Sequence, residues 1–168
     1  MKNFYENPEI QSLNRLPSRS HLIPFADAKS SIIECAEGPE CHEKTESSFV
    51  KYLDGKWDFA FSTNPDLSFN DVKKWDKINV PGTWSLQGWD KPHYTNVQMP
   101  FDTIPPNVPE ENPTGLYRLK TTLPREWKGR RIVLHIGSAE SVTQLFVNGI
   151  EAGISKDTRF PWEFDISY

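Results

Sequence analysis

The sequence predicts an all-β protein, a β-sandwich of the jelly-roll type, and three observations support this fold class. Apolar and polar residues alternate in several short segments, which is the pattern of half-buried strands. Turn signals separate these segments at short intervals, as they do in sandwiches and barrels. The composition includes 14 prolines, 9 glycines and 12% aromatic residues. It therefore favours turns, long ordered loops and a thin core built from large rings.

The clearest predicted strand covers residues 56–62, where Trp57, Phe59 and Phe61 fall on one face. Asn148-Gly149 is the strongest short hairpin signal in the chain, so the segments on either side of it should pair antiparallel. Residues 83–113 show no period and are rich in proline, which predicts a long functional loop. The other expected strands are residues 78–80, 116–123, 131–136, 142–147 and 151–154, with a further one entered within 159–166.

The N-terminal part of the chain has a different character from the rest. Its first thirty residues show no clear period and are expected to form an extended arm with turns. Between Glu34 and Glu46 every third residue is glutamate, and Gly38-Pro39 would break a helix there, so we expect an exposed acidic loop. This predicts an arm and acidic loop at residues 1–45 and a jelly-roll domain at residues 46–168.

Charge and hydropathy exclude several classes of function. The net charge is −4 and no basic cluster is present, which argues against nucleic-acid binding. No apolar run is long enough to span a membrane, and the N-terminal residues do not resemble a signal peptide, so a cytoplasmic location is expected. Cys35, Cys41 and His42 do not complete a four-ligand zinc site, and the cysteines are interpreted as free thiols.

A series of motifs in a fixed order resembles the N-terminal sugar-binding domain of glycoside hydrolase family 2 β-galactosidases. The resemblance runs from about residue 6 to the last residue. One departure is Gly82-Thr83, where the family more often has Ser-Asn. The motifs are Asn7-Pro8 with Leu13-Asn14-Arg15-Leu16, Leu53-Asp54-Gly55-x-Trp57-x-Phe59, Val80-Pro81-Gly82-Thr83-Trp84, Tyr94-Thr95-Asn96-Val97, Glu111-Asn112-Pro113-Thr114-Gly115-x-Tyr117, Val147-Asn148-Gly149 and Asp157-Thr158-Arg159-x-Pro161.

The resemblance implies a galactose-binding-like jelly roll and two substrate-binding residues, Asn96 and Asp157. An amide and a carboxylate suit sugar hydroxyls, because an amide both donates and accepts hydrogen bonds and a carboxylate accepts strongly. The resemblance also gives Asp157 a role in holding a sodium ion. As alternatives, Asn96 could cap a turn and Asp157 could pair with Arg159 on the surface. Arg159 itself is expected to brace the loop through a contact with a carboxylate.

Aromatic residues in the long loop allow two interpretations. Trp89 and Tyr94 could stack on the C–H face of a pyranose ring. They could equally pack against the proline-rich loop, which is the interpretation favoured for Trp84. The sequence leaves both interpretations open for Trp89 and Tyr94.

By resemblance, the function is that of the N-terminal part of a β-galactosidase, which hydrolyses terminal non-reducing β-D-galactose residues in substrates such as lactose. Retaining glycosidases need two carboxylates about 5–5.5 Å apart. In this family both are glutamates of a later barrel domain, so the isolated chain is expected to be inactive and to lack the last strands of its sandwich. Magnesium would enter only through the catalytic domain.

The expected partners are the β-galactoside and the rest of the enzyme chain or a barrel subunit, and the full enzyme is expected to be a homo-oligomer. The alternatives are a stand-alone carbohydrate-binding module and an assembly subunit that completes a separate barrel chain.

Overall fold

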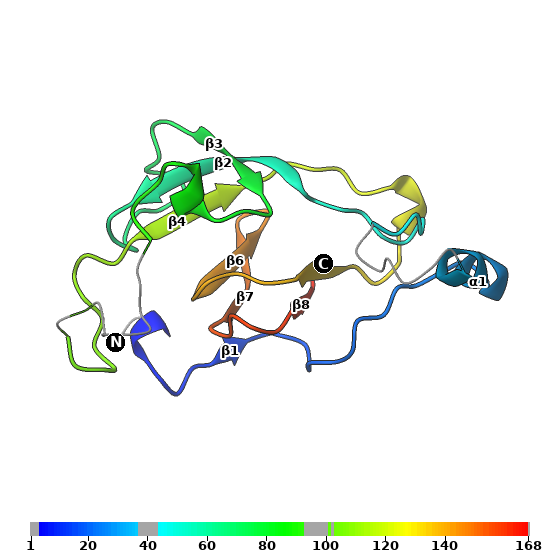
Figure 1. Cartoon of the computed structure of the whole chain (residues 1–168), viewed down its shortest axis with the longest axis horizontal. Helices are drawn as coiled ribbons and strands as arrows, with labels where there is room; N and C mark the ends of the chain where they lie inside the picture. The colour runs from blue at the N-terminus through cyan, green and yellow to red at the C-terminus, as the bar shows by residue number, and fades with distance from the viewer. Residues whose placement is uncertain (1–3, 37–43, 93–100, 102, 168) are drawn as a thin grey trace. The chain divides into compact units, whose positions relative to one another are not determined.

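The computed structural model describes residues 4–36, 44–92, 101 and 103–167 (Figure 1). Strands predominate among them, and all the strand pairs are antiparallel, which confirms the predicted all-β, jelly-roll-like class. The elements in chain order are η1 (Phe4–Glu6), β1 (Ser12–Leu13), α1 (Ala28–Ala36), β2 (Gly55–Ser62), β3 (Asp76–Val80), η2 (Trp84–Gln87), β4 (Thr114–Arg118), η3 (Arg125–Trp127), β5 (Val133–Ile136), β6 (Thr143–Val147), β7 (Ile150–Ser155) and β8 (Trp162–Asp165).

The chain divides into two compact units. The first combines Met1–Lys51 with Leu123–Tyr168, so it is built from both ends of the chain, and the second is Tyr52–Thr122. The predicted division at residues 45 and 46 follows the order of the sequence, and it stays a prediction. The contact pattern instead groups the N-terminal segment with the strands from β5 to β8.

The second unit holds the sheet β3-β2-β4 (Figure 1). Its central strand β2 confirms the strand predicted at residues 56–62, and Phe59 is fully buried. Ile78 of β3 and Leu116 of β4 are also buried, at 2% and 5% exposed. The alternation of the sequence therefore places large apolar residues of all three strands in one core. Ala60 is buried as well, at 7% exposed, so β2 is covered on both faces at this point.

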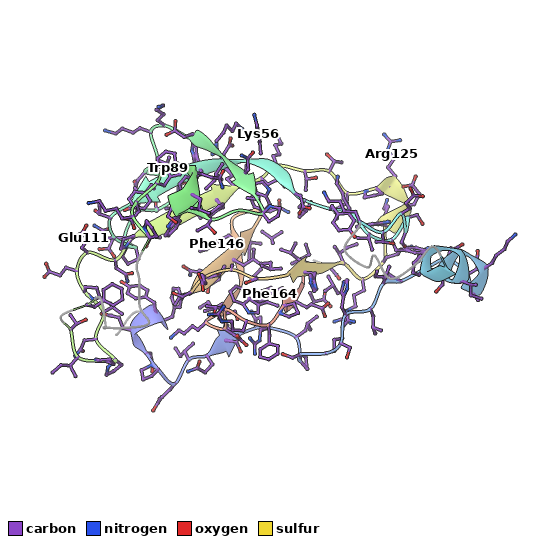
Figure 2. All side chains as sticks on the ribbon, in the orientation of Figure 1. Lys56, Trp89, Glu111, Arg125, Phe146 and Phe164 are labelled. Carbon is purple, nitrogen blue, oxygen red and sulfur yellow. The ribbon has the colours of Figure 1, made fainter. Side chains whose placement is uncertain are left out.

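The first unit holds the sheet β1-β7-β6 and the pair β5-β8. The predicted hairpin is confirmed, since β6 and β7 pair antiparallel across Asn148 and Gly149. These two residues have φ values of 52° and 83°, as a two-residue hairpin turn with positive φ requires. The side chains of Trp162 and Phe164 on β8 are buried, at 0% and 1% exposed. Phe164 is labelled in Figure 2.

The N-terminal arm is joined to this unit by a short strand. Ser12 pairs with Ser155 and Leu13 with Ile154, so β1 lies along the C-terminal half of β7. Gly153 is needed beside this contact, because a Cβ there would lie 2.6 Å from the Leu13 carbonyl oxygen. The arm therefore behaves as an edge strand of the sheet.

Three details differ from the sequence predictions. A helix, α1, follows the expected extended arm. Asp27 caps it by accepting a 2.8 Å hydrogen bond from the Ser30 backbone N–H, and such a cap favours the start of a helix at this point. Glu34 lies in α1 rather than in a loop, while residues 37–43 of the predicted acidic loop, with Cys41 and His42, lie outside the described residues. The strand predicted at residues 116–123 is β4, which ends at Arg118, the last residue in register with β2.

None of the helices within residues 4–36, 44–92 and 103–167 has the length and apolar character needed to cross a membrane.

Candidate functional site

Asp157 lies in a tight turn directly after β7. Its Oδ1 accepts a 3.0 Å hydrogen bond from the backbone N–H of Arg159, which is the geometry of an Asx turn. The side chain keeps 34% of its surface exposed. The turn therefore holds the carboxylate at the surface, with hydrogen-bonding capacity left for a ligand.

Arg15 of the N-terminal arm provides the positive charge beside this carboxylate. Its Nη1 lies 3.7 Å from Asp157 Oδ2 and donates a 3.2 Å hydrogen bond to Ser155 Oγ. Ser155 is fully buried at the end of β7. The sequence predicts this bracing role for the side chain of Arg159. In the structure Arg159 contributes its backbone N–H, and the guanidinium that faces Asp157 belongs to Arg15.

Lys156 points toward the arm. Its Nζ donates hydrogen bonds to the carbonyl oxygens of Phe4 and Asn7, at 2.5 and 2.7 Å, and its backbone N–H donates to the Gln11 carbonyl oxygen at 3.1 Å. Burial lowers the pKa of the Lys156 amine. The last residue of β7 and the residue after it therefore both form hydrogen bonds with the arm. Ser155 accepts one from Arg15, and Lys156 donates one to Phe4 of η1.

The remaining turn residues are anchored less firmly. The Thr158 carbonyl oxygen accepts a 2.9 Å hydrogen bond from the Ser138 hydroxyl. Arg159 is exposed, and Phe160 is 61% exposed. Phe160 thus presents an exposed aromatic ring three residues after Asp157 in the sequence. Phe160 is not among the site residues predicted from the sequence.

Of the other predicted site residues, Asn96 and Tyr94 lie outside the described residues. Trp89, labelled in Figure 2, belongs to the second unit. It contacts Phe59 edge-on, with ring centroids 5.0 Å apart, and stacks on Phe61 at 6.4 Å. Trp84 packs on the same two rings. These contacts favour the packing interpretation for both tryptophans, whose side chains are half-buried.

The sodium site expected from the resemblance stays a prediction. Asp157 would fit as one anionic ligand of a monovalent cation, because its carboxylate is partly exposed and has free lone pairs. No group of three or more His, Cys, Asp or Glu side chains in the described ranges is arranged to hold a metal ion. A cation at Asp157 would need most of its ligands from elsewhere.

Comparison with known proteins matches this architecture to a defined class. The family model described as "Glycosyl hydrolases family 2, sugar binding domain" matches residues 50–168, so the fold and the Asp157 turn belong to an all-β sugar-binding domain. The chain is 36% identical over 170 residues to a β-galactosidase of Psychromonas ingrahamii, a match that covers 97% of this chain and 16% of that enzyme. A β-galactosidase of Erwinia tasmaniensis gives the same identity and coverage. A β-galactosidase of Priestia megaterium is 33% identical over 176 residues, covering 96% of this chain and 16% of the enzyme.

This chain belongs to glycosyl hydrolase family 2. It spans about a sixth of the length of the relatives that it matches.

Proposed function

We propose that this chain forms the N-terminal part of a β-galactosidase, an enzyme that hydrolyses terminal non-reducing β-D-galactose residues from substrates such as lactose. The observation that carries the proposal is the match of 97% of the chain to bacterial β-galactosidases at 36% identity. In this role the chain supplies contacts to the galactosyl group, and the two catalytic carboxylates belong to a separate catalytic domain. Magnesium would also belong to that domain.

Asn96 and Asp157 are the proposed sugar contacts. The geometry of Asp157 supports its role, because one carboxylate oxygen is held by the turn and the side chain is still 34% exposed. A sugar hydroxyl that donates to this carboxylate would form a charge-assisted hydrogen bond. Such a bond contributes about 1.5–3 kcal/mol, which corresponds to roughly 10- to 150-fold in kcat/KM.

Asp157 is also proposed as one ligand of a sodium ion. A monovalent cation that bridges the carboxylate and a sugar hydroxyl would fix one orientation of the ring. The other ligands would come from the rest of the enzyme. We further propose that the complete enzyme is cytoplasmic and is a homo-oligomer.

A chimeric enzyme tests the proposal. This chain replaces the matching N-terminal 16% of the Psychromonas ingrahamii β-galactosidase, and hydrolysis of a chromogenic aryl β-galactoside is measured in the resulting protein, here called the chimera. Asp157→Asn is the informative variant. Asparagine keeps an oxygen that accepts the Arg159 N–H but removes the negative charge.

Asp165→Asn is the matched control. Asp165 also accepts a backbone N–H in a turn, from Ser167 at 3.1 Å, and it pairs with Arg131 at 2.7 Å. The expected result is an active chimera in which Asp157→Asn and Asn96→Ala each lower kcat/KM at least 10-fold, while Asp165→Asn leaves it unchanged. A chimera that assembles like the parent enzyme and hydrolyses no β-galactoside would overturn the proposal. So would equal effects of Asp157→Asn and Asp165→Asn.

Assays of the isolated chain separate the proposed function from its two alternatives. A stand-alone carbohydrate-binding module would bind galactose as the isolated chain, in an assay such as isothermal titration calorimetry. An assembly subunit would restore activity when the isolated chain is added to the parent enzyme without its N-terminal region. The proposed function predicts no hydrolysis by the isolated chain.

A further inference from the structure

Arg15 is placed where it can control the orientation of the Asp157 carboxylate. Its guanidinium contacts two residues near the end of β7, the hydroxyl of the fully buried Ser155 at 3.2 Å and Asp157 Oδ2 at 3.7 Å. The Arg15 side chain is only 21% exposed, less than the 34% of Asp157. The Arg15 side chain is therefore more buried than the carboxylate that it faces.

The backbone around Arg15 is held on both sides. Before it, Leu13 pairs with Ile154 of β7; Arg15 itself then forms a bridge with Phe164 of β8. After it, the Leu16 N–H donates a 2.8 Å hydrogen bond to the Glu163 carbonyl oxygen. These contacts tie the start of the Arg15 side chain to the same two strands that flank the Asp157 turn.

Asn14 makes the bend that allows this placement. It has a φ of 57°, a left-handed conformation that asparagine tolerates better than most residues. Its side-chain amide donates a 3.3 Å hydrogen bond to the Ala152 carbonyl oxygen. The arm thus turns from its pairing with β7 toward β8 at the residue just before Arg15.

Two anchors then act on one carboxylate. The Arg159 N–H binds Oδ1 and the Arg15 guanidinium faces Oδ2. The terminal torsion of an aspartate side chain is broad when nothing restrains it. With one group at each oxygen, the plane of the Asp157 carboxylate is restrained. Each carboxylate oxygen has two lone pairs, so both still have room for a sugar hydroxyl or a cation.

We propose that Arg15 is a positioning residue for the galactosyl contact made by Asp157, and that the N-terminal arm is therefore part of the framework of the sugar subsite. This inference rests on the proposed function. It assigns Arg15 no contact with the sugar itself. Its effect on the reaction is exerted through the carboxylate of Asp157.

Arg19 provides a matched control on the same arm. Its guanidinium binds the Glu163 carboxylate through Nε and Nη2, both at 2.9 Å. Removing Arg19 therefore costs the arm an ion pair to β8 and leaves the Arg15–Asp157 contact in place. A purely structural role for the arm would make Arg15→Gln and Arg19→Gln equivalent.

The test is a double-mutant cycle in the chimera, with kcat/KM for an aryl β-galactoside as the readout. Arg15→Gln is expected to lower kcat/KM about 10-fold, since small misplacement of a contact group can cost up to about 100-fold. Arg15→Lys should recover part of the loss, because it restores the charge without the planar fork that reaches two partners. In the Asp157→Asn background Arg15→Gln should have no further effect, and Arg19→Gln should stay within about twofold of the parent.

The outcomes separate the two proposals. If Asp157→Asn leaves kcat/KM unchanged, the proposed function of Asp157 fails. If Asp157→Asn lowers kcat/KM, three results would overturn the inference about Arg15. Arg15→Gln could leave kcat/KM unchanged, or it could lower kcat/KM by the same factor as Arg19→Gln. The third result is a double variant whose loss in kcat/KM equals the product of the two single losses.

An inactive chimera would count against the proposed function, and Arg15 can then be tested in the isolated chain. There the double variant should shift the urea midpoint by less than the sum of the shifts caused by Arg15→Gln and Asp157→Asn alone, if the two residues interact. Additive midpoint shifts would overturn the inference.

Discussion

Replacing Gly153 by alanine tests the packing of the N-terminal arm against β7 within the first unit. Gly153 lies in the middle of β7, where an added Cβ would meet both the backbone of β1 and the Phe164 ring. A Cβ built at this position lies 2.3 Å from one carbon of that ring and 2.6 Å from the Leu13 carbonyl oxygen. Ordinary contacts begin near 3.4 Å, so the ring and the arm must both move away from the new Cβ, each by about 1 Å.

Neither the Phe164 ring nor the Leu13 backbone can move without a loss of stability. Phe164 is 1% exposed, so its ring is surrounded, and the Leu13 carbonyl belongs to a backbone that is paired with Ile154. Overpacking of this kind costs typically 1–3 kcal/mol. Because both sides are blocked, we expect a loss near the upper end, about 3 kcal/mol. For a chain of this size that corresponds to a Tm lower by roughly 6–12 °C.

The assay is urea unfolding of the isolated chain, followed by tryptophan fluorescence. The control is Gly137→Ala, at a glycine where an added Cβ meets nothing within 4 Å and φ is not positive. This variant should be neutral or more stable by about 0.4–1 kcal/mol, because alanine restricts the unfolded chain. Equal stabilities of the Gly153 and Gly137 variants would refute the packing of β1 against β7.

Three further predictions concern other parts of the chain. The pKa of Asp165 is lowered to about 2, first by the Ser167 hydroxyl and then by Arg131. Its contribution to stability is therefore complete above the unfolded value near 3.8 and lost as pH falls from about 4 to 2. Urea midpoints of Asp165→Asn and the parent should thus differ at pH 6 and converge at pH 2; a constant difference would contradict this. Asn148→Ala should cost about 1–2 kcal/mol in urea unfolding, because φ is 52° there. Asn148→Gly should cost less, and the reverse order would count against the turn. Phe59→Ala should cost about 3–5 kcal/mol and reduce the near-ultraviolet circular dichroism, since Phe59 is fully buried; a loss below 1 kcal/mol would exclude it from the core.

Much of the fold was predictable because its strands carry local signals. Alternation around Phe59 located β2, and Asn148-Gly149 located the β6–β7 hairpin. The strand β1 has only two residues and no period of its own, so its pairing with β7 depends on a distant partner that sequence pattern does not show. Helix α1 was missed for a different reason. Its cap, Asp27, was visible in the sequence, but the helix is short and carries no strong apolar face.

The candidate site was predictable in part. Asp157 was predicted from a motif and its sugar contact stays a prediction, while the structure shows its turn and its backbone partner. The roles of Arg15 and Ser155 were not found, since Arg15 lies about 140 positions before its partners and no local pattern links them. Arg159 was the natural choice for the ion pair because it is near in sequence. In the fold, the guanidinium that faces the carboxylate is that of Arg15 on the arm.

The pairing of the arm with β7 also has a consequence for synthesis on the ribosome. Asn14 and its partner Ala152 are 138 positions apart. At about 5–20 residues per second, the arm would wait roughly 7–28 s after its own synthesis before β7 exists. The segment Tyr52–Thr122 is made entirely within that interval and contains all three strands of its own sheet. The second unit can therefore fold during translation before β7 is made, whereas the arm that faces Asp157 can pair only after β7 has been synthesised.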